Sequence, residues 1–212
     1  MILEHWPFLA LIPAGAAAGW GAASMALRLD EEPGRARGLL MPAAVVIGAA
    51  IPVWAMGAEP ASIVVAACLG WWLLLAAVVD GRHFWLPDWL TLPLLAAGLA
   101  VTALLDRTAL IDHLIGAAAG FAVLWGLAAL YRRTRGREGL GGGDFRLLAA
   151  AGAWVGWMGL PSVLLRASVA GLSLVLARLA LKQAVSGQDR LPFGVFLALG
   201  IWMTWLYGPL GL

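Results

Sequence analysis

The chain has 212 residues, of which 62% are hydrophobic and 12% are charged, and its formal net charge is +2. Together with a mean hydropathy of +0.89, this composition excludes a soluble enzyme, a disordered chain and a secreted disulfide-stabilised domain. The small positive charge is divided among several loops, which favours contact with lipid headgroups over nucleic acid.

Charged residues gather in short clusters, and the runs between them approach the roughly 20 residues needed to cross a hydrocarbon core of about 30 Å. Such runs predict helices, because a bilayer core has no water to satisfy backbone groups. The eight predicted spans are residues 6–27, 39–58, 61–79, 89–105, 114–131, 145–159, 161–181 and 191–207. Gly159 and Pro161 predict a tight hairpin between the sixth and seventh spans. The first run follows acidic Glu4 and predicts a membrane helix, not a cleavable signal.

Lysine and arginine residues set the predicted orientation of these spans. The loops after the first, third, fifth and seventh spans carry ten of them, whereas the loops after the second, fourth and sixth spans carry only Arg107. Cytoplasmic loops carry the excess of positive charge in membrane proteins. The sequence therefore predicts an all-α polytopic membrane protein with about eight transmembrane helices and both termini on the non-cytoplasmic side.

The single cysteine, Cys68, lies inside an apolar run. One cysteine cannot form a disulfide within the chain or a cysteine zinc site, and its place predicts an inert buried thiol. His83 with Asp80 and Asp88 on a short loop is a weak metal-binding pattern. We therefore expect no metal ion and no cofactor.

Two aspartates lie at the ends of predicted spans. Asp80 ends the third span, and Asp144 opens the sixth immediately after three glycines. In the predicted orientation both carboxyl groups reach the cytoplasmic edge of the bilayer at similar depth, where an ionisable group indicates function. The alternative is that each is an ordinary charge at a helix end, and Asp144 is a good N-cap residue.

Two aspartates that meet form a chemical unit. Like charges at close range cannot both ionise easily, so the pair shares a proton. The ionised carboxylate can then take a proton from water while the protonated partner polarises a peptide carbonyl. Gly141 and Gly143, just before Asp144, would let the backbone approach an extended substrate closely.

Three segments resemble motifs of a known family. Residues 79–95 read VDGRHFWLPDWLTLPLL, residues 139–156 read GLGGGDFRLLAAAGAWVG, and residues 191–200 read LPFGVFLALG. In this order they are similar to the D…LPD.LT.PLL segment, the GxGD segment followed by KLLAALGAWLG, and the PFGPFLALG segment of bacterial type IV prepilin peptidases. The eight-span count also agrees with the architecture of that family.

The resemblance implies a membrane-embedded aspartic endopeptidase of the GxGD type, with Asp80 and Asp144 as the catalytic carboxylates. Its substrates would be prepilins or pseudopilins of type IV pilus or type II secretion systems, whose short basic leader is removed at the cytoplasmic face of the bacterial inner membrane. We expect one membrane-embedded peptidase domain over residues 1–212, with its core motifs within 79–200. The expected partners are these substrates and the lipid bilayer, without nucleic acid.

The sequence departs from the family pattern in three places, one of which is Val195, where the family motif has proline. Full-length members carry paired CxxC motifs for zinc in a cytoplasmic loop between the first two spans, and this loop is associated with N-methylation of the new terminus. Here the corresponding segment, about 28–38, contains no cysteine, so we expect a peptidase without methyltransferase activity. Arg146 stands where the family usually has lysine, which keeps the positive charge.

Some polar residues have both a structural and a functional interpretation. Asp88 favours a helix cap, although a third acid near Asp80 could tune the aspartates or contact the leader. Glu31 and Glu32, with Asp30, could hold the basic leader by charge complementarity. Arg166, near the outer end of the seventh span, is predicted to extend toward the interface.

Two rival functions use the same aspartates. A non-enzymatic carrier or channel would bind a cation or relay protons through Asp80 and Asp144. An inactive scaffold would serve pilus or secretion assembly. Cleavage of a prepilin-like substrate that is lost on replacing either aspartate by asparagine would distinguish the enzyme from both.

Overall fold

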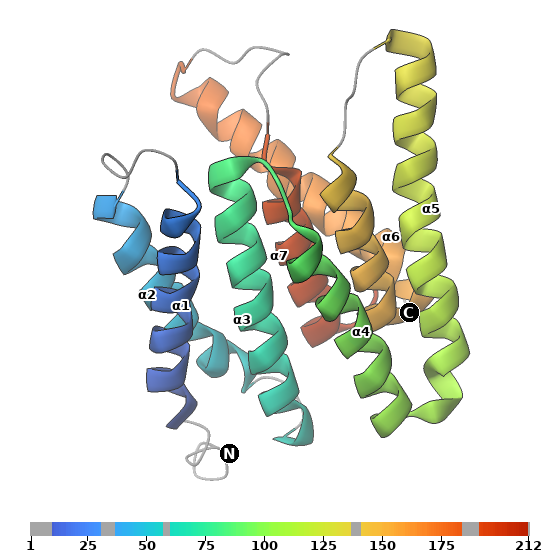
Figure 1. The fold of residues 1–212 in the computed structure, drawn as a ribbon, viewed down its shortest axis with the longest axis horizontal. Coiled ribbons are helices and arrows are strands. Elements are labelled where there is room, and N and C mark those ends of the chain that lie inside the picture. The colour runs from blue at the N-terminus through green and yellow to red at the C-terminus, as the bar shows by residue number, and fades with distance from the viewer. Residues whose placement is uncertain (1–9, 31–36, 57–59, 137–140, 184–190, 212) are drawn as a thin grey trace. The chain divides into compact units, whose positions relative to one another are not determined.

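The described part of the protein is built from helices (Figure 1). A computed structural model describes residues 10–30, 37–56, 60–136, 141–183 and 191–211. Within these ranges the elements are α1 (Leu11–Arg28), α2 (Arg37–Ala55), α3 (Pro60–His83), α4 (Asp88–Leu105), the short 3-10 helix η3 (Arg107–Ala109), α5 (Leu110–Arg135), α6 (Gly142–Ala180) and α7 (Phe193–Tyr207). The all-α prediction is confirmed. The chain divides into two compact units, residues 1–82 and 83–212, and each is described by itself.

The first unit packs α1 against α2 through glycine. A methyl group on Gly15 would lie 2.1 Å from the carbonyl oxygen of Gly48, and one on Gly19 would lie 2.0 Å from that of Ala44. Only glycine therefore lets the two backbones come this close, as in the small-residue contacts of membrane helices. On α3, Trp71 donates its indole N–H to the Gly48 carbonyl at 3.1 Å, which ties α3 to the same contact.

The second unit repeats this device between α5 and α6. The letters GAAAG that carry the α1 glycines recur at residues 116–120. A methyl group on Gly116 would lie 2.6 Å from the carbonyl oxygen of Gly152, and one on Gly120 would lie 2.3 Å from that of Leu148. Small residues four positions apart therefore form a close helix contact in both units.

Helix α6 bends at Gly156, whose φ of 69° and ψ of 175° are not helical. This backbone region is almost restricted to glycine, because a side chain there would clash with the backbone. The predicted break between the sixth and seventh spans is therefore present, but it lies at Gly156, and the position predicted at Gly159 and Pro161 is wrong because the helix continues through both residues. Pro161 is the fifth residue after the bend, and its missing N–H removes the helical hydrogen bond that the Trp157 carbonyl would otherwise accept.

His113 of α5 fills the hydrogen-bonding gap at this bend. Its Nδ1 lies 2.9 Å from the carbonyl oxygen of Ala153 and 3.1 Å from Oγ1 of Thr102. In a regular helix the Ala153 carbonyl would accept from the N–H of Trp157, beyond the bend. Because a carbonyl only accepts, Nδ1 of His113 carries the hydrogen and donates.

Arg166 caps the C-terminal end of α7. Its guanidinium donates to Oγ1 of Thr204 at 2.8 Å and to the carbonyl oxygen of Gly208 at 3.0 Å. A cation at this end is favoured by the helix dipole and by the carbonyls that lack partners there. Arg166 thus makes a contact within the second unit, and its extension toward the interface stays a prediction.

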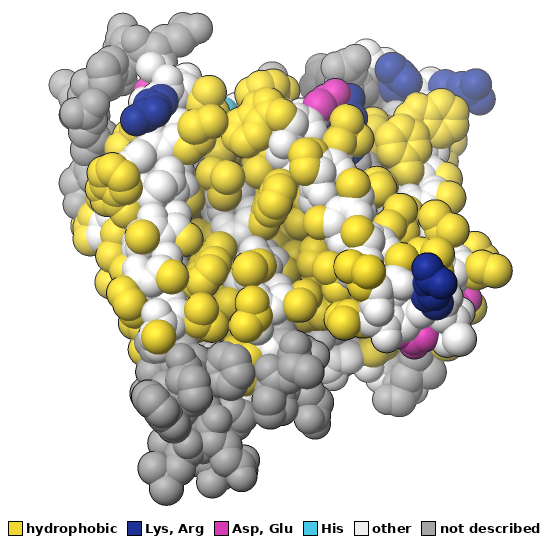
Figure 2. Space-filling model, turned by 60° about the horizontal axis from the view of Figure 1, so that its bottom comes forward, with side chains coloured by type: hydrophobic (Ala, Val, Ile, Leu, Met, Phe, Trp, Pro, Cys, Tyr) yellow, Lys and Arg dark blue, Asp and Glu magenta, His cyan; other side chains and the backbone are white. Residues whose placement is uncertain are grey.

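Hydrophobic side chains cover much of the described surface (Figure 2). On α5, for example, Phe121, Val123, Trp125, Leu127 and Leu130 are 42–59% exposed. Soluble proteins rarely expose apolar surface on this scale. Cys68 of α3 is exposed as well, so the prediction of a buried thiol is wrong; an apolar surface that faces lipid has no need to bury it.

Four described helical stretches are long and apolar enough to cross a membrane. They are Ile63–His83, Asp88–Leu105, Arg107–Thr134 and Gly142–Ala180, and the shorter apolar helices are Leu39–Ala55 and Phe193–Tyr207. Length and composition therefore indicate a membrane protein.

Candidate active site

Asp80 lies in the last turn of α3, in the first unit, and its exposed fraction is only 5%. Its neighbour Val79 is fully buried. Two positions further along, the Arg82 guanidinium forms an ion pair with the Asp30 carboxylate, just beyond the end of α1. The helix that corresponds to the third predicted span thus carries a buried carboxylate in its last turn and ends at His83.

Asp144 lies in the first turn of α6, in the second unit, and is 8% exposed. The N-cap of α6 is Gly141, with φ −72° and ψ 144°, and Asp144 is the third residue of the helix. The backbone N–H of Asp144 donates to the Gly141 carbonyl at 3.1 Å. The interpretation of Asp144 as an ordinary N-cap is therefore wrong, and its burial needs another reason.

The glycines before Asp144 differ in their surroundings. A methyl group on Gly143 would lie 2.6 Å from Cβ and 2.7 Å from the carbonyl oxygen of Leu86, so this glycine lets the start of α6 pack against the segment before α4. Among the described residues, a methyl group on Gly141 would have only Oδ2 of Asp144 within 4 Å, at 3.6 Å. The described surroundings thus leave room beside the backbone at Gly141 and fill it at Gly143.

The segment before α4 is held in place from several sides. Phe84 has a positive φ of 52°, and Leu86 is buried with 2% exposure. Pro87 is the N-cap of α4, so Asp88 lies in the first turn and is not the cap. Its carboxylate instead forms an ion pair with Arg146 of α6, with 2.5 Å between Oδ1 and Nη1.

The structure places the predicted site residues at two helix ends. Gly141, Gly143 and Asp144 share the start of α6 in the second unit, whereas Asp80 ends α3 in the first unit. The meeting of the two carboxyl groups stays a prediction. The ion pairs of Arg82 and Arg146 were missed, although the spacing Asp-x-Arg at both aspartates was a signal in the sequence.

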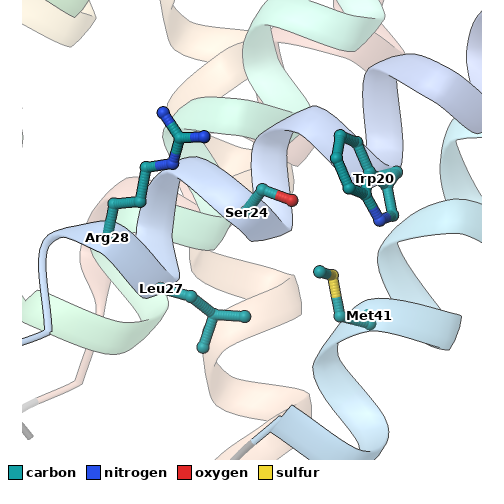
Figure 3. Close-up of a pocket in the computed structure, with 5 residues that line it drawn as sticks. All are labelled: Trp20, Ser24, Leu27, Arg28 and Met41. Carbon is teal, nitrogen blue, oxygen red and sulfur yellow. The ribbon is translucent and has the colours of Figure 1, made fainter. Parts of the chain in front are cut away.

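A hollow between α1 and α2 holds neither aspartate (Figure 3). Its lining residues are Trp20, Ser24, Leu27, Arg28 and Met41. Oγ of Ser24 is buried and has no hydrogen-bond partner among the described residues. Among all the described residues, no group of three or more His, Cys, Asp or Glu side chains could hold a metal ion.

These features define a helical membrane protein with buried carboxylates at two helix ends. The sequence profile of the type IV leader peptidase family matches residues 67–176, which include Asp80 and Asp144. The chain belongs to the type IV leader peptidase family, which confirms the resemblance seen in the motifs.

Similar proteins carry the name prepilin leader peptidase/N-methyltransferase. The one from Aeromonas hydrophila is 42% identical over 155 residues, which are 73% of this chain and 53% of that protein. The one from Pseudomonas aeruginosa is 42% identical over 140 residues, 66% and 48% of the two chains. The one from Burkholderia pseudomallei is 44% identical over 136 residues, 64% and 44%. The chain thus spans about half the length of these relatives. No solved structure matches it significantly.

Proposed function

We propose that the protein is a membrane-embedded aspartic endopeptidase that removes the short basic leader of type IV prepilins or pseudopilins. The observation that carries this proposal is the burial of Asp80 and Asp144, 5% and 8% exposed, at helix ends inside the family match. A buried carboxylate is costly unless it is protonated or compensated. Such a cost is typical of catalytic groups.

In the proposed mechanism the two carboxyl groups converge and share one proton. The ionised aspartate takes a proton from a water molecule, which attacks the scissile carbonyl carbon, while the protonated aspartate donates a hydrogen bond to the carbonyl oxygen. The proton then passes to the leaving amine, so the pair is restored. The open backbone at Gly141 would lie beside the substrate strand, and Gly143 would keep α6 close to the segment before α4.

We further propose eight membrane spans with both termini on the non-cytoplasmic side of the bacterial inner membrane. The seven described α-helices support this count, since α6 consists of two helical segments that meet at Gly156. Residues 1–212 would form one peptidase domain, with the core motifs within 79–200. Cleavage would take place at the cytoplasmic face, for a pilus or a secretion system.

The proposed reaction is cleavage without methylation. The similar proteins are named for both activities, but the segment between α1 and α2 contains no cysteine for a zinc site. Mass spectrometry of the product would show this directly, because a methyl group on the new N-terminus changes its mass.

The test is coexpression with a prepilin substrate, followed by mass spectrometry of the substrate's N-terminus. We expect the wild type to give a shortened, unmethylated product, and Asp80→Asn or Asp144→Asn to give none, because each variant lacks one member of the acid/base pair. A loss of about 10⁴-fold or more in rate is reasonable for such groups. Asp106→Asn is the matched control, since this carboxylate is exposed. Full cleavage by both site variants would end the proposal.

A further inference from the structure

Each predicted catalytic aspartate is followed two positions later by an arginine. The two tripeptides are Asp80-Gly81-Arg82 at the end of α3 and Asp144-Phe145-Arg146 at the start of α6. Each arginine is ion-paired with an acid from another segment of the same compact unit. The same local arrangement thus occurs independently in the two units.

In the first unit, Arg82 ties the end of α3 to the segment that follows α1. Its guanidinium pairs with the Asp30 carboxylate, and the two side chains are only 19% and 14% exposed. Asp30 is therefore engaged within the protein, which argues against its predicted role in holding a basic leader. Glu31 and Glu32, the other residues of that prediction, lie outside the described residues.

In the second unit, Arg146 ties the start of α6 to the start of α4. Its Nη1 lies 2.5 Å from Oδ1 of Asp88, and the side chains are 33% and 58% exposed. The neighbouring contact of Gly143 with Leu86 joins the same two segments. Asp144 lies between these two contacts in sequence, so the first turn of α6 is held on either side of it.

Helix geometry separates the arginine from the aspartate. Residues two positions apart on a helix are about 200° apart around its axis, so their side chains do not face each other. Arg146 therefore anchors the side of α6 away from Asp144, and the same holds for Arg82 and Asp80 on α3. An anchor on that side fixes the rotation of the helix end and with it the direction of the carboxyl group.

We propose that Arg82 and Arg146 are positioning residues, held by Asp30 and Asp88, that orient the two catalytic aspartates. This inference rests on the proposed peptidase function. The Arg146–Asp88 pair is 33% and 58% exposed, so we expect it to contribute little to global stability. The Arg82–Asp30 pair is only 19% and 14% exposed, so removing one of its partners should also lower stability. Loss of either pair should lower the rate of the chemical step, because small displacements of catalytic groups are costly.

The experiment uses the full-length protein in lipid nanodiscs and a synthetic membrane-anchored peptide with a short basic leader that ends in glycine. Asp88→Asn and Arg146→Gln should each lower kcat about tenfold or more with KM within about twofold, whereas Arg146→Lys should keep at least about half of the activity. Asp30→Asn, Arg82→Gln and Arg82→Lys should follow the same pattern. Asp106→Asn, at the other end of α4 and about 27 Å from Asp88, should leave kcat unchanged.

Amide hydrogen exchange at residues 142–147 gives a second measurement that does not depend on cleavage. Asp88→Asn and Arg146→Gln should speed exchange there, while Arg146→Lys and Asp106→Asn should not. Wild-type kcat and wild-type exchange in both loss variants would overturn the positioning role. A wild-type protein that fails to cleave would overturn the peptidase function instead, and exchange would still decide whether the pair holds α6.

Discussion

At the scale of single residues, the acids of this chain fall into two environments. Asp106 is exposed and caps η3 by accepting from Thr108, as expected for an ordinary charge at a helix end. Asp80 and Asp144 are buried, and neither sits at an N-cap. Burial of an acid costs stability unless the surroundings compensate it, and the proposed catalysis would give these two acids a reason to be buried that Asp106 lacks.

The contribution of Asp106 to the stability of the fold should depend on pH. The hydroxyl of Thr108 and then its backbone N–H donate to this carboxylate, which holds the pKa of Asp106 below its usual value of 3.8. A carboxyl group whose pKa is lower in the folded state stabilises the fold above its unfolded pKa, and this contribution is lost as the pH falls through the folded value. We expect Asp106→Asn to lower the thermal unfolding midpoint at neutral pH.

The difference in unfolding midpoint between the wild type and Asp106→Asn should depend on pH. It should be constant above about pH 5 and shrink as the pH falls below about 4. Thermal unfolding of the wild type and the variant in detergent, across this range, measures it. A difference that grows toward low pH would contradict the assignment.

The sequence indicated which acidic residues belong to the candidate site, but it did not indicate which residues surround them. Asp80 and Asp144 stood out because they end apolar runs and match family motifs. The ion partners of Arg82 and Arg146 could not be predicted from spacing alone, since Asp30 and Asp88 come from other elements. The cap at Gly141 was also missed, because aspartate is the better N-cap by propensity and tertiary burial overrode that preference.

At the scale of elements, apolar runs predicted helices well because the bilayer leaves the backbone few alternatives. The break within α6 lies three residues before Gly159 and five before Pro161, where the turn was predicted. Gly159 and Pro161 were the stronger turn signal, but the bend lies at Gly156, where His113 of α5 satisfies the freed carbonyl of Ala153. A partner 40 residues away in sequence thus supports the bend at this position, and local propensity could not reveal that partner.

Two glycines on α5 provide a matched test of the α5–α6 contact. A methyl group on Gly116 would lie 2.6 Å from a backbone oxygen of α6, whereas one on Gly126 meets nothing within 4 Å. We expect Gly116→Ala to destabilise the protein by about 1–3 kcal/mol through overpacking. Gly126→Ala should be neutral or stabilising by up to about 1 kcal/mol, because alanine favours a helix.

Equilibrium unfolding in mixed micelles, by titration with a denaturing detergent, compares the two variants. We expect the two substitutions to change the free energy of unfolding in opposite directions or by clearly unequal amounts. The gain in helix propensity is the same in both, and only the contact with α6 differs. Equal destabilisation by Gly116→Ala and Gly126→Ala would show that the close contact does not hold α5 against α6.

At the scale of the whole molecule, the account depends on two units that each supply one aspartate. The family match spans both, since it begins on α3 and ends on α6. Peptide hydrolysis by a shared proton needs the carboxyl groups within hydrogen-bond reach of one water molecule. The relation between the units is therefore the central claim.

Cysteine cross-linking tests this relation most directly. The native cysteine is first removed by Cys68→Ser, and then Asp80→Cys and Asp144→Cys are introduced together. A disulfide requires Cβ atoms to approach within about 4 Å, and a short bifunctional thiol reagent tolerates a somewhat wider gap. Asp80→Cys with Asp106→Cys is the control, because the proposed topology places these two residues on opposite sides of the membrane.

Mass spectrometry of the linked peptides identifies the products in native membranes. We predict a high yield of the link between positions 80 and 144 and none between positions 80 and 106. No link between positions 80 and 144, from a folded protein whose two thiols both react with a single-site reagent, would contradict the convergence of the aspartates and with it the proposed catalysis.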